Sequence, residues 1–241
     1  MGASVSNGSR DTLARVNRLG ALVYDRFVMR RSQEAGLAEL RRSALADARG
    51  DVLEIGAGTG LNLGEYPRTG ITRLVLTEPN PAMARHIEAK RDSAPVPVEV
   101  VEATAEALPF EDASFDTVTG TLVLCEADDP RRALDEISRV LRPGGRYLFL
   151  EHVRSGDPAL ARTQDRWAPV WKAFAGGCTC NRDTLATIEA SGLDVQRSRM
   201  GGRRHMVRIP DRVAGRVRMD GNVVEERRQA HHRDVRPFGG G

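Results

Sequence analysis

The hydrophobic and polar positions of the chain follow two different periods. Between residues 11 and 49, apolar residues recur at three- and four-residue steps, which predicts two helices before the first strand. Their markers are Leu13, Val16, Leu19, Leu22, Val23, Phe27, Val28, Leu37, Leu40 and Leu45. From about residue 50 to residue 150, short apolar runs alternate with helical stretches. This alternation is typical of an α/β domain with a parallel sheet.

The alternating region contains five predicted strands. They cover 51–55, 74–77, 96–101, 115–124 and 147–150. The fourth has almost no polar side chains, as expected for a strand buried on both faces. Helices are predicted at 61–66, 81–90, 130–141 and 181–190. Asp129 and Asn181 are placed to cap the last two. A closing pair of strands, one of them antiparallel, is expected at 193–198 and 205–209.

The turn after the first strand carries the clearest candidate chemistry. Gly56, Gly58 and Gly60 come just after Glu54 and Ile55, and glycine lets the backbone approach a ligand closely. Glu78 ends the second strand, where a carboxylate in this kind of sheet binds two ribose hydroxyls. The third glycine comes one residue too early for the dinucleotide fingerprint. A nucleotide-type ligand without a diphosphate is therefore expected.

Five motifs in order resemble those of the class I S-adenosylmethionine (SAM) methyltransferases. They lie at 51–60, 78–83, 105–110, 114–116 and 139–145. The resemblance implies a Rossmann-like fold: a seven-stranded, mostly parallel sheet with one antiparallel strand, helices on both faces and an N-terminal helical lid. It also implies SAM as the cofactor.

The same resemblance implies a set of cofactor contacts. They are Glu54, Gly56, Ala57, Gly58, Gly60, Asn62, Glu78, Pro79, Met83, Ala105, Glu106, Thr121 and Leu122. Glu78 would bind the ribose, while Ala105 and Glu106 would lie near the adenine amino group. Asn62 either contacts the amino-acid end of SAM or caps a helix. Met83 either lies against the adenine or ribose or packs in the core.

The methyl acceptor is expected at the carboxyl ends of the fourth and fifth strands, where open α/β sheets bind ligands. The candidate catalytic residues there are Cys125, Glu151 and His152. Residues 153–180, rich in large apolar rings, are interpreted as a substrate cap over a small, largely apolar acceptor. The candidate acceptor contacts are Tyr24, Trp167, Trp171, Cys178 and Asn181.

Alternatives stay open for several of these side chains. Tyr24 belongs either to a lid or to helix packing. His152 either accepts a proton or only hydrogen-bonds behind the site, and Cys125 fits packing better than reactivity. Cys178 and Cys180 with one distant His lack the spacing of a four-ligand zinc site, so no metal is expected.

Three runs of the sequence resemble, more specifically, the methyltransferase-like thiol S-methyltransferases and their bacterial relatives. The runs lie at 121–125, 151–154 and 177–184. They imply methyl transfer to the sulfur of a small thiol. A thiol with a pKa of about 8.5 is partly thiolate at neutral pH, so no strong general base is required. Transfer to O, N or C of a small natural product or quinol is the alternative, and a non-catalytic SAM-binding regulator is another.

Composition and charge bear on the size, the location and the partners of the protein. Of the 241 residues, 40% are hydrophobic, which is enough for one large domain, and no apolar run approaches a membrane span. A cytoplasmic protein with three reduced cysteines is expected. Residues 197–241 carry twelve Arg and five acidic residues, a net +7, with little aromatic interleaving for nucleic acid.

The expected organisation has four parts. Residues 1–10 form a disordered N-terminus, 11–49 a helical lid, 50–215 the methyltransferase domain and 216–241 a basic, disordered tail. The expected partner is a small-molecule acceptor. Neither nucleic-acid binding nor stable membrane insertion is expected, and the protein is expected to be a monomer or a homodimer.

Overall fold

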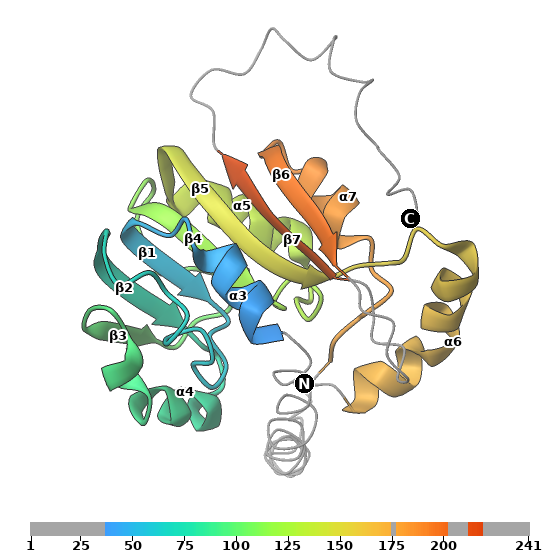
Figure 1. The fold of residues 1–241 in the computed structure, drawn as a ribbon, viewed down its shortest axis with the longest axis horizontal. Helices are drawn as coiled ribbons and strands as arrows, with labels where there is room; N and C mark the ends of the chain where they lie inside the picture. Colours follow the sequence, from blue (N-terminus) through green and yellow to red (C-terminus); the bar gives the residue numbers. More distant parts are fainter. Residues whose placement is uncertain (1–36, 175–176, 202–211, 219–241) are drawn as a thin grey trace, which may run out of the picture.

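One sheet runs through the middle of the molecule (Figure 1). The structure, a computed structural model, describes residues 37–174, 177–201 and 212–218. The strands are β1 Gly50–Ile55, β2 Ile71–Thr77, β3 Val98–Val101, β4 Phe115–Thr121, β5 Leu141–His152, β6 Asp194–Gly201 and β7 Arg212–Arg218. Their order in the seven-stranded sheet is β3-β2-β1-β4-β5-β7-β6. β1 to β5 are parallel, and β7 is antiparallel to both of its neighbours. The predicted parallel α/β sheet is confirmed.

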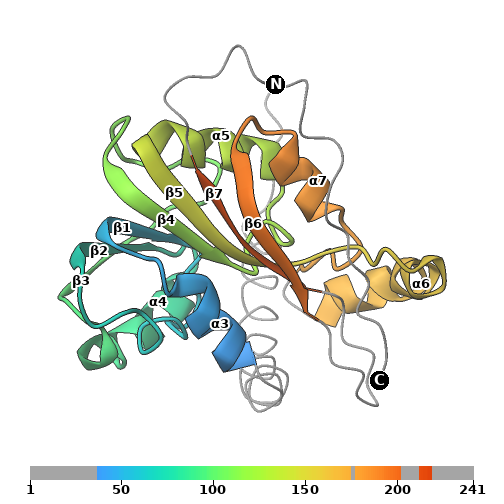
Figure 2. The same ribbon diagram turned by 45° about the horizontal axis from the view of Figure 1, so that its top comes forward.

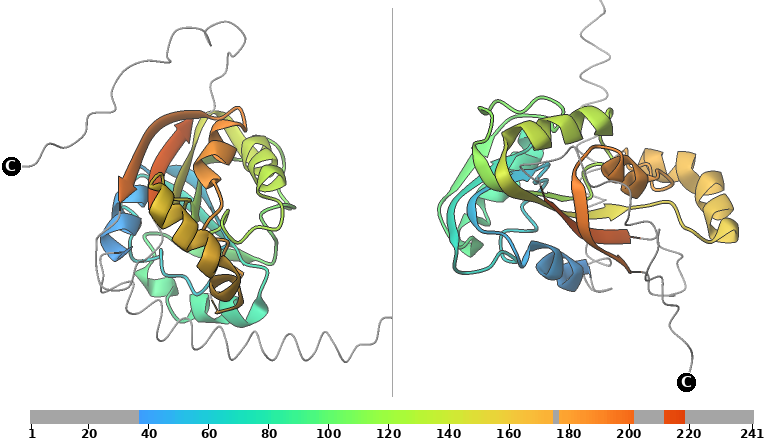
Figure 3. Two further views of the ribbon diagram at one scale, coloured as in Figure 1. Left: turned by 90° about the vertical axis from the view of Figure 1, so that its right-hand side faces the viewer. Right: turned by 90° about the horizontal axis from the view of Figure 1, so that it is seen from above.

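Helices cover both faces of the sheet (Figures 2 and 3). α5 (Pro130–Val140) and α7 (Thr184–Glu189) lie on one face, and α3 (Ala38–Leu45) and α4 (Pro81–Glu88) lie on the other. Each face has its own apolar core. The first contains Leu53, Val118, Leu134, Ile137 and Ile188, and the second contains Leu45, Val52, Leu74, Ile87 and Leu148. The sheet is therefore a middle layer between two helical layers.

The strand order reverses between β1 and β4. From β1 the chain moves outward through β2 and β3 and then returns to β4 on the other side of β1. Open sheets of this kind bind ligands beyond the carboxyl ends of the strands at such a reversal. The glycine turn after β1 and the turn after β4 meet there, because a Cβ added to Gly56 would come within 2.9 Å of Val123 Cγ2.

Several local predictions are corrected by the structure. Residues 61–66 form turns and not a helix, because their amides bond three residues back, as Glu65 N does to the carbonyl of Asn62. α7 is capped by Asp183, whose carboxylate accepts from Ala186 N, and not by Asn181. β5 begins at Leu141, so the glycine pair 144–145 lies inside this strand and does not precede it.

Residues 153–180, interpreted from the sequence as a substrate cap, contain a long helix that the sequence pattern did not predict. α6 (Pro158–Phe174) projects beyond the end of the sheet (Figure 1). It is started by Asp157, whose carboxylate accepts from Ala159 N at 2.8 Å. Among the helices that the structure describes, none is long and apolar enough to cross a membrane.

The two ends of the chain are only partly described. The first expected N-terminal helix, the strand expected at 205–209 and most of the expected tail lie outside the described residues. β7 ends at Arg218, three residues beyond the expected end of the domain. α3 belongs to the second expected N-terminal helix and is the part of the expected lid region that the structure describes.

Candidate active site

The glycine turn is joined to Glu78 by hydrogen bonds. Glu78 Oε2 accepts from Gly58 N at 2.8 Å, and its Oε1 accepts from Asn80 N at the same distance. Burial raises the pKa of Glu78, although these two amide hydrogen bonds oppose the shift. Gly58 has φ 58°, and a Cβ placed on it would meet no atom within 4 Å. A buried carboxylate beside open space along a glycine turn fits a ligand that carries ribose hydroxyls.

A buried polar network lies behind this turn. Glu54 accepts from Asn62 Nδ2 at 2.9 Å and from the Tyr66 hydroxyl at 2.8 Å. Arg41 of α3 donates to Asn62 Oδ1 at 2.8 Å and to Thr121 Oγ1 at 2.7 Å. Burial raises the pKa of Glu54 to about 7, while the hydrogen bonds from Tyr66 and Asn62 oppose the shift. Three predicted cofactor contacts, Glu54, Asn62 and Thr121, thus bind one another and fix the shape of the turn.

Glu151 fixes the turn that follows β4. Its carboxylate accepts from the backbone N–H groups of Val123, Leu124 and Cys125 at 2.9, 2.8 and 3.1 Å. Burial raises the pKa of Glu151 to about 7 against these three hydrogen bonds. At the start of the turn, Leu122 has φ 64°, a conformation that non-glycine residues rarely adopt. Glu151, predicted as catalytic, thus holds the backbone of this turn with both of its carboxylate oxygens.

A cluster of two thiols and an imidazole, the sulfur–imidazole cluster of Cys125, His152 and Cys178, lies next to this turn. Cys178 Sγ lies 3.1 Å from His152 Nδ1 and 3.5 Å from Cys125 Sγ, and the remaining Sγ–Nδ1 distance is 3.7 Å. All three residues are buried. The hydrogen bond between the two thiols, aided by His152, lowers the pKa of the Cys178 thiol, whereas the pKa of the Cys125 thiol is raised. Three predicted site residues are thus brought together.

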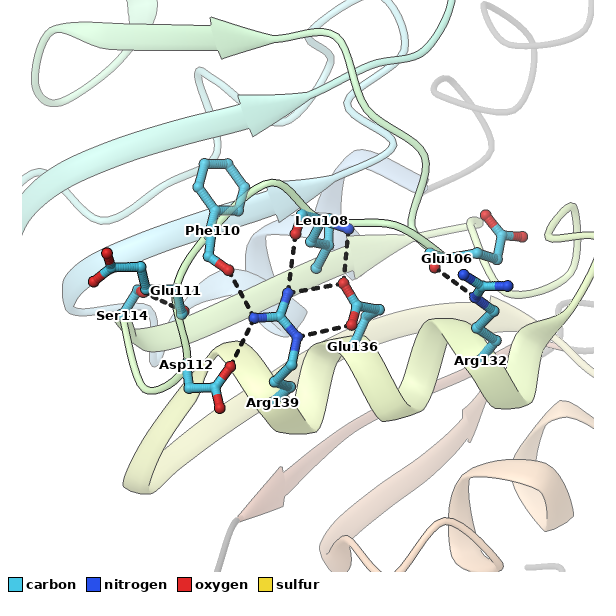
Figure 4. Close-up of polar contacts among 9 residues, drawn as sticks. All are labelled: Glu106, Leu108, Phe110, Glu111, Asp112, Ser114, Arg132, Glu136 and Arg139. Atoms are coloured by element: carbon cyan, nitrogen blue, oxygen red, sulfur yellow. Dashed lines mark hydrogen bonds and ion pairs between the residues drawn. The ribbon is translucent and has the colours of Figure 1, made fainter.

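α5 holds the side of the site nearest β3 (Figure 4). Glu106 Oε1 accepts from Asp128 N at 3.0 Å, and the Glu106 carbonyl accepts from Arg132 Nε at 3.0 Å. Arg139 donates to two further carbonyl oxygens of the same loop. Met83 is half-buried on α4. The Glu106 carboxylate therefore helps to position the loop from which Ala105 and Glu106 were expected to contact a ligand.

Known proteins that are similar in sequence identify the family of this chain. Residues 53–149 match the model of a methyltransferase domain. Human thiol S-methyltransferase TMT1A is 30% identical over 179 residues, covering 70% of this chain and 69% of that relative. The chain belongs to the SAM-dependent methyltransferase family. SAM is accordingly its cofactor.

Other similar proteins agree on the family and differ in their acceptors. Human thiol S-methyltransferase TMT1B is 36% identical over 158 residues, which cover 60% of this chain and 61% of that relative. The chain thus spans about three fifths of its length. The ubiquinone/menaquinone biosynthesis C-methyltransferase UbiE of Enterobacter sp. strain 638 is 34% identical over 167 residues, or 66% of each chain.

Solved structures share the fold. A SAM-dependent methyltransferase of Thermotoga maritima, a possible histamine N-methyltransferase, superposes with a TM-score of 0.59 at 23% identity, covering 82% of this chain and 99% of its own. The N-methyltransferase NodS of Bradyrhizobium japonicum, solved with S-adenosylhomocysteine, gives 0.57 at 19% identity, covering 75% and 84%. At these identities the likeness concerns the fold alone.

The predicted acceptor contacts of this methyltransferase-family chain separate into two groups. Trp171 packs, half-buried, against a small apolar cluster that contains Cys125, Cys178 and Leu122. Trp167 is 58% exposed on α6 and does not line this site. The Asn181 side chain donates to Asp165 Oδ1 at the surface. Tyr24 is outside the described residues.

Arg41 is the main residue that sequence reasoning missed. An arginine in a helix is ordinarily expected on the solvent side. Arg41 is 4% exposed, and it lies four residues from both Leu37 and Leu45, which are fully buried. Because residues four apart share a helix face, that spacing was the signal that Arg41 faces inward. Tyr66 was missed because its turn was interpreted as a helix.

Proposed function

We propose that this chain transfers the methyl group of SAM to the sulfur of a small thiol. The observation that carries the proposal is the buried sulfur–imidazole cluster at the carboxyl ends of β4 and β5. It occurs in a chain that is similar to two thiol S-methyltransferases. The cluster gives the site a soft, weakly hydrated lining that suits a sulfur acceptor.

On the cofactor side, Glu78 would bind both ribose hydroxyls. Its two oxygens accept from amides of the glycine turn and of Asn80, and each has a further lone pair for a hydroxyl. Gly58 leaves the space beside this carboxylate open. Bound SAM supplies an electrophilic methyl group on a sulfonium. The network of Glu54, Asn62 and Arg41 would keep the glycine turn in its binding shape before SAM arrives.

On the acceptor side, the residues would orient the thiol and exclude water. The cluster is packed against Leu122, Leu150 and half-buried Trp171. A thiolate and a sulfonium lose their opposite charges as they react, so the transition state is less polar than the reactants and gains from a dry site. Glu151 would act indirectly, because it holds the backbone that carries Cys125 in place. Positioning would then supply most of the rate enhancement.

A competition assay with methyl-labelled SAM tests the proposal. Small thiols, phenols, amines and quinols would be offered separately, with Glu78→Ala as the variant that should not retain SAM. We expect label transfer to thiols at the highest kcat/KM. Faster methylation of quinols would overturn the proposal in favour of the C-methylation named for UbiE. SAM binding without transfer to any acceptor would favour a regulator instead.

A further inference from the structure

Three soft metal ligands converge in this structure from distant segments of the chain. Cys125 follows β4, His152 ends β5 and Cys178 follows α6. Their two sulfurs and the imidazole Nδ1 all lie within 4.8 Å of one another, and all three residues are buried. Among the residues that the structure describes, these are the ones that form such a group. Thiolate and imidazole together are ligands that zinc prefers.

The distances within the cluster are close to those around a zinc ion. With Zn–S bonds of about 2.3 Å and a Zn–N bond of about 2.0 Å, tetrahedral geometry separates neighbouring donor atoms by roughly 3.5 to 3.8 Å. The observed separations are 3.1, 3.5 and 3.7 Å. Expansion by roughly half an ångström or less would therefore admit the ion. Such a shift is small for side chains at strand ends and in a turn.

The number of ligands indicates what kind of zinc site this would be. Structural zinc sites are closed by four protein ligands, whereas catalytic sites have three and leave one position for water or substrate. Cys180, the other buried thiol of the described chain, is not part of the ligand group. Apolar residues surround the group, with Leu122, Leu150 and Trp171 among them. A fourth ligand would thus have to come from outside the described protein.

We propose that Cys125, His152 and Cys178 bind one Zn²⁺ ion whose fourth position takes the sulfur of the thiol substrate. The second half of this proposal rests on the thiol methylation proposed above. A thiol that binds zinc gives up its proton, here to solvent, and stays bound as thiolate. A lone pair of that sulfur then forms a bond to the methyl carbon. The bond from this carbon to the SAM sulfur breaks, and its electron pair stays on S-adenosylhomocysteine.

The same chemistry releases the product. The methylated sulfur is a neutral thioether, which binds zinc more weakly than a thiolate does. Water can then replace it, and the next thiol can enter. The cycle consumes one thiol and one SAM and releases one thioether, one S-adenosylhomocysteine and one proton, so that no oxidant or reductant is needed.

Metal content and cobalt spectroscopy on the full chain test the site apart from activity. We expect about one Zn²⁺ per reduced chain after reconstitution and dialysis. Cys125→Ser, Cys178→Ser and His152→Ala should each lower this occupancy at least about tenfold. Cys180→Ser is the matched control, because Cys180 is buried nearby without belonging to the group, and it should keep full occupancy. Circular dichroism would establish that each variant is folded.

The Co²⁺-substituted wild type supplies a readout that needs no variant. We expect thiolate-to-cobalt charge-transfer absorption and the strong visible bands of four-coordinate cobalt. Adding 2-mercaptoethanol should shift the visible bands as its sulfur takes the fourth position. A wild type that binds neither ion, or a Cys180→Ser variant that loses metal as Cys178→Ser does, would overturn the site. Bound Co²⁺ whose visible bands do not change when 2-mercaptoethanol is added would refute the proposal that the substrate sulfur takes the fourth position.

Activity separates this proposal from the one on which it rests. Thiol methylation that survives full removal of zinc would refute the role of the metal and leave thiol S-methylation standing. Zinc bound at the three residues, together with methylation of quinols and not thiols, would give the opposite result. It would support the metal site and would refute both the thiol as its fourth ligand and the thiol as the methyl acceptor.

Discussion

The two halves of the candidate site are built in different ways. On the cofactor side, the glycine turn after β1 and the carboxylate of Glu78 after β2 lie in two short stretches, joined by a hydrogen bond from Gly58 N. On the acceptor side, Cys125, His152 and Cys178 come from three distant segments, which the pairing of β4 with β5 and a backbone hydrogen bond from Thr179 N to the Cys125 carbonyl bring together. Local backbone geometry makes the first half, whereas contacts between distant segments make the second. Changes on one side should therefore leave the other largely intact.

The largest effect is expected on the cofactor side. Glu78→Ala would remove the two charge-assisted hydrogen bonds that we propose to the ribose, each contributing about 1.5 to 3 kcal/mol. The Kd of SAM, measured by titration calorimetry, should rise at least about a hundredfold. Glu99→Ala on β3 is the matched control, because it removes a carboxylate from an exposed ion pair. An unchanged Kd in Glu78→Ala would remove the ribose assignment.

The second largest effect is a pH dependence of the free energy of unfolding, which arises from Glu54 in the network behind the glycine turn. The pKa of Glu54 is about 7 in the fold, against 4.5 as its ordinary value, so the folded state retains this proton longer than the unfolded state. The contribution of Glu54 to the free energy of unfolding is therefore full below pH 4.5 and is lost as pH rises through 7.

Glu54→Gln isolates this contribution, because glutamine keeps a similar shape but does not titrate. The free energy of unfolding of the wild type minus that of Glu54→Gln should fall by about 2.5 kcal/mol from pH 5 to pH 8. Urea unfolding at several pH values measures it. A difference that stays flat with pH would show that Glu54 ionises normally in the fold.

A smaller effect is expected from Trp171, on the acceptor side. Trp171→Ala opens the apolar wall beside the sulfur–imidazole cluster, so kcat for a small thiol should fall by about tenfold while the Kd of SAM changes less than about twofold. Trp167→Ala provides the control, because Trp167 is exposed on the same helix. Loss of SAM binding in a folded Trp171→Ala protein would contradict the separation of the two sides.

The smallest effect belongs to Asn181. Its side chain donates to Asp165 at the surface, in a pair with Arg154. Asn181→Ala should lower the free energy of unfolding by less than about 1 kcal/mol, because exposed polar pairs contribute little. The KM for a thiol should stay within about twofold of the wild type. A large rise in KM would instead indicate that Asn181 contacts the methyl acceptor.

The cofactor side could be predicted from the sequence because its signals are local. A strand, alternating glycines and a carboxylate at the end of the next strand constrain the backbone within a few residues. The hydrogen bonds of Glu54 and Asn62 were not predicted in this way, because two other residues complete their network. Arg41 was expected at the surface on account of its charge, and Tyr66 was expected in a helix.

The acceptor side was predicted residue by residue but not as a unit. Cys125, His152 and Cys178 were each singled out, yet a metal was excluded because ligand spacing was judged along the chain. The strands bring Cys125 and His152 together through the pairing of β4 with β5, and a turn after α6 adds Cys178. Trp167 and Trp171 are four residues apart, and the pattern gave no way to tell that only Trp171 is half-buried.

Arg41 also constrains the order in which the molecule folds. Its partner Thr121 is 80 residues away in the chain. During synthesis α3 and the other partner of Arg41, Asn62, therefore emerge long before β4. Burying a guanidinium that still lacks one of its partners is unfavourable. Docking of α3 onto the sheet should follow the pairing of β1 with β4. Pulse-labelling hydrogen exchange would detect this as amide protection in α3 that appears later than protection in β4.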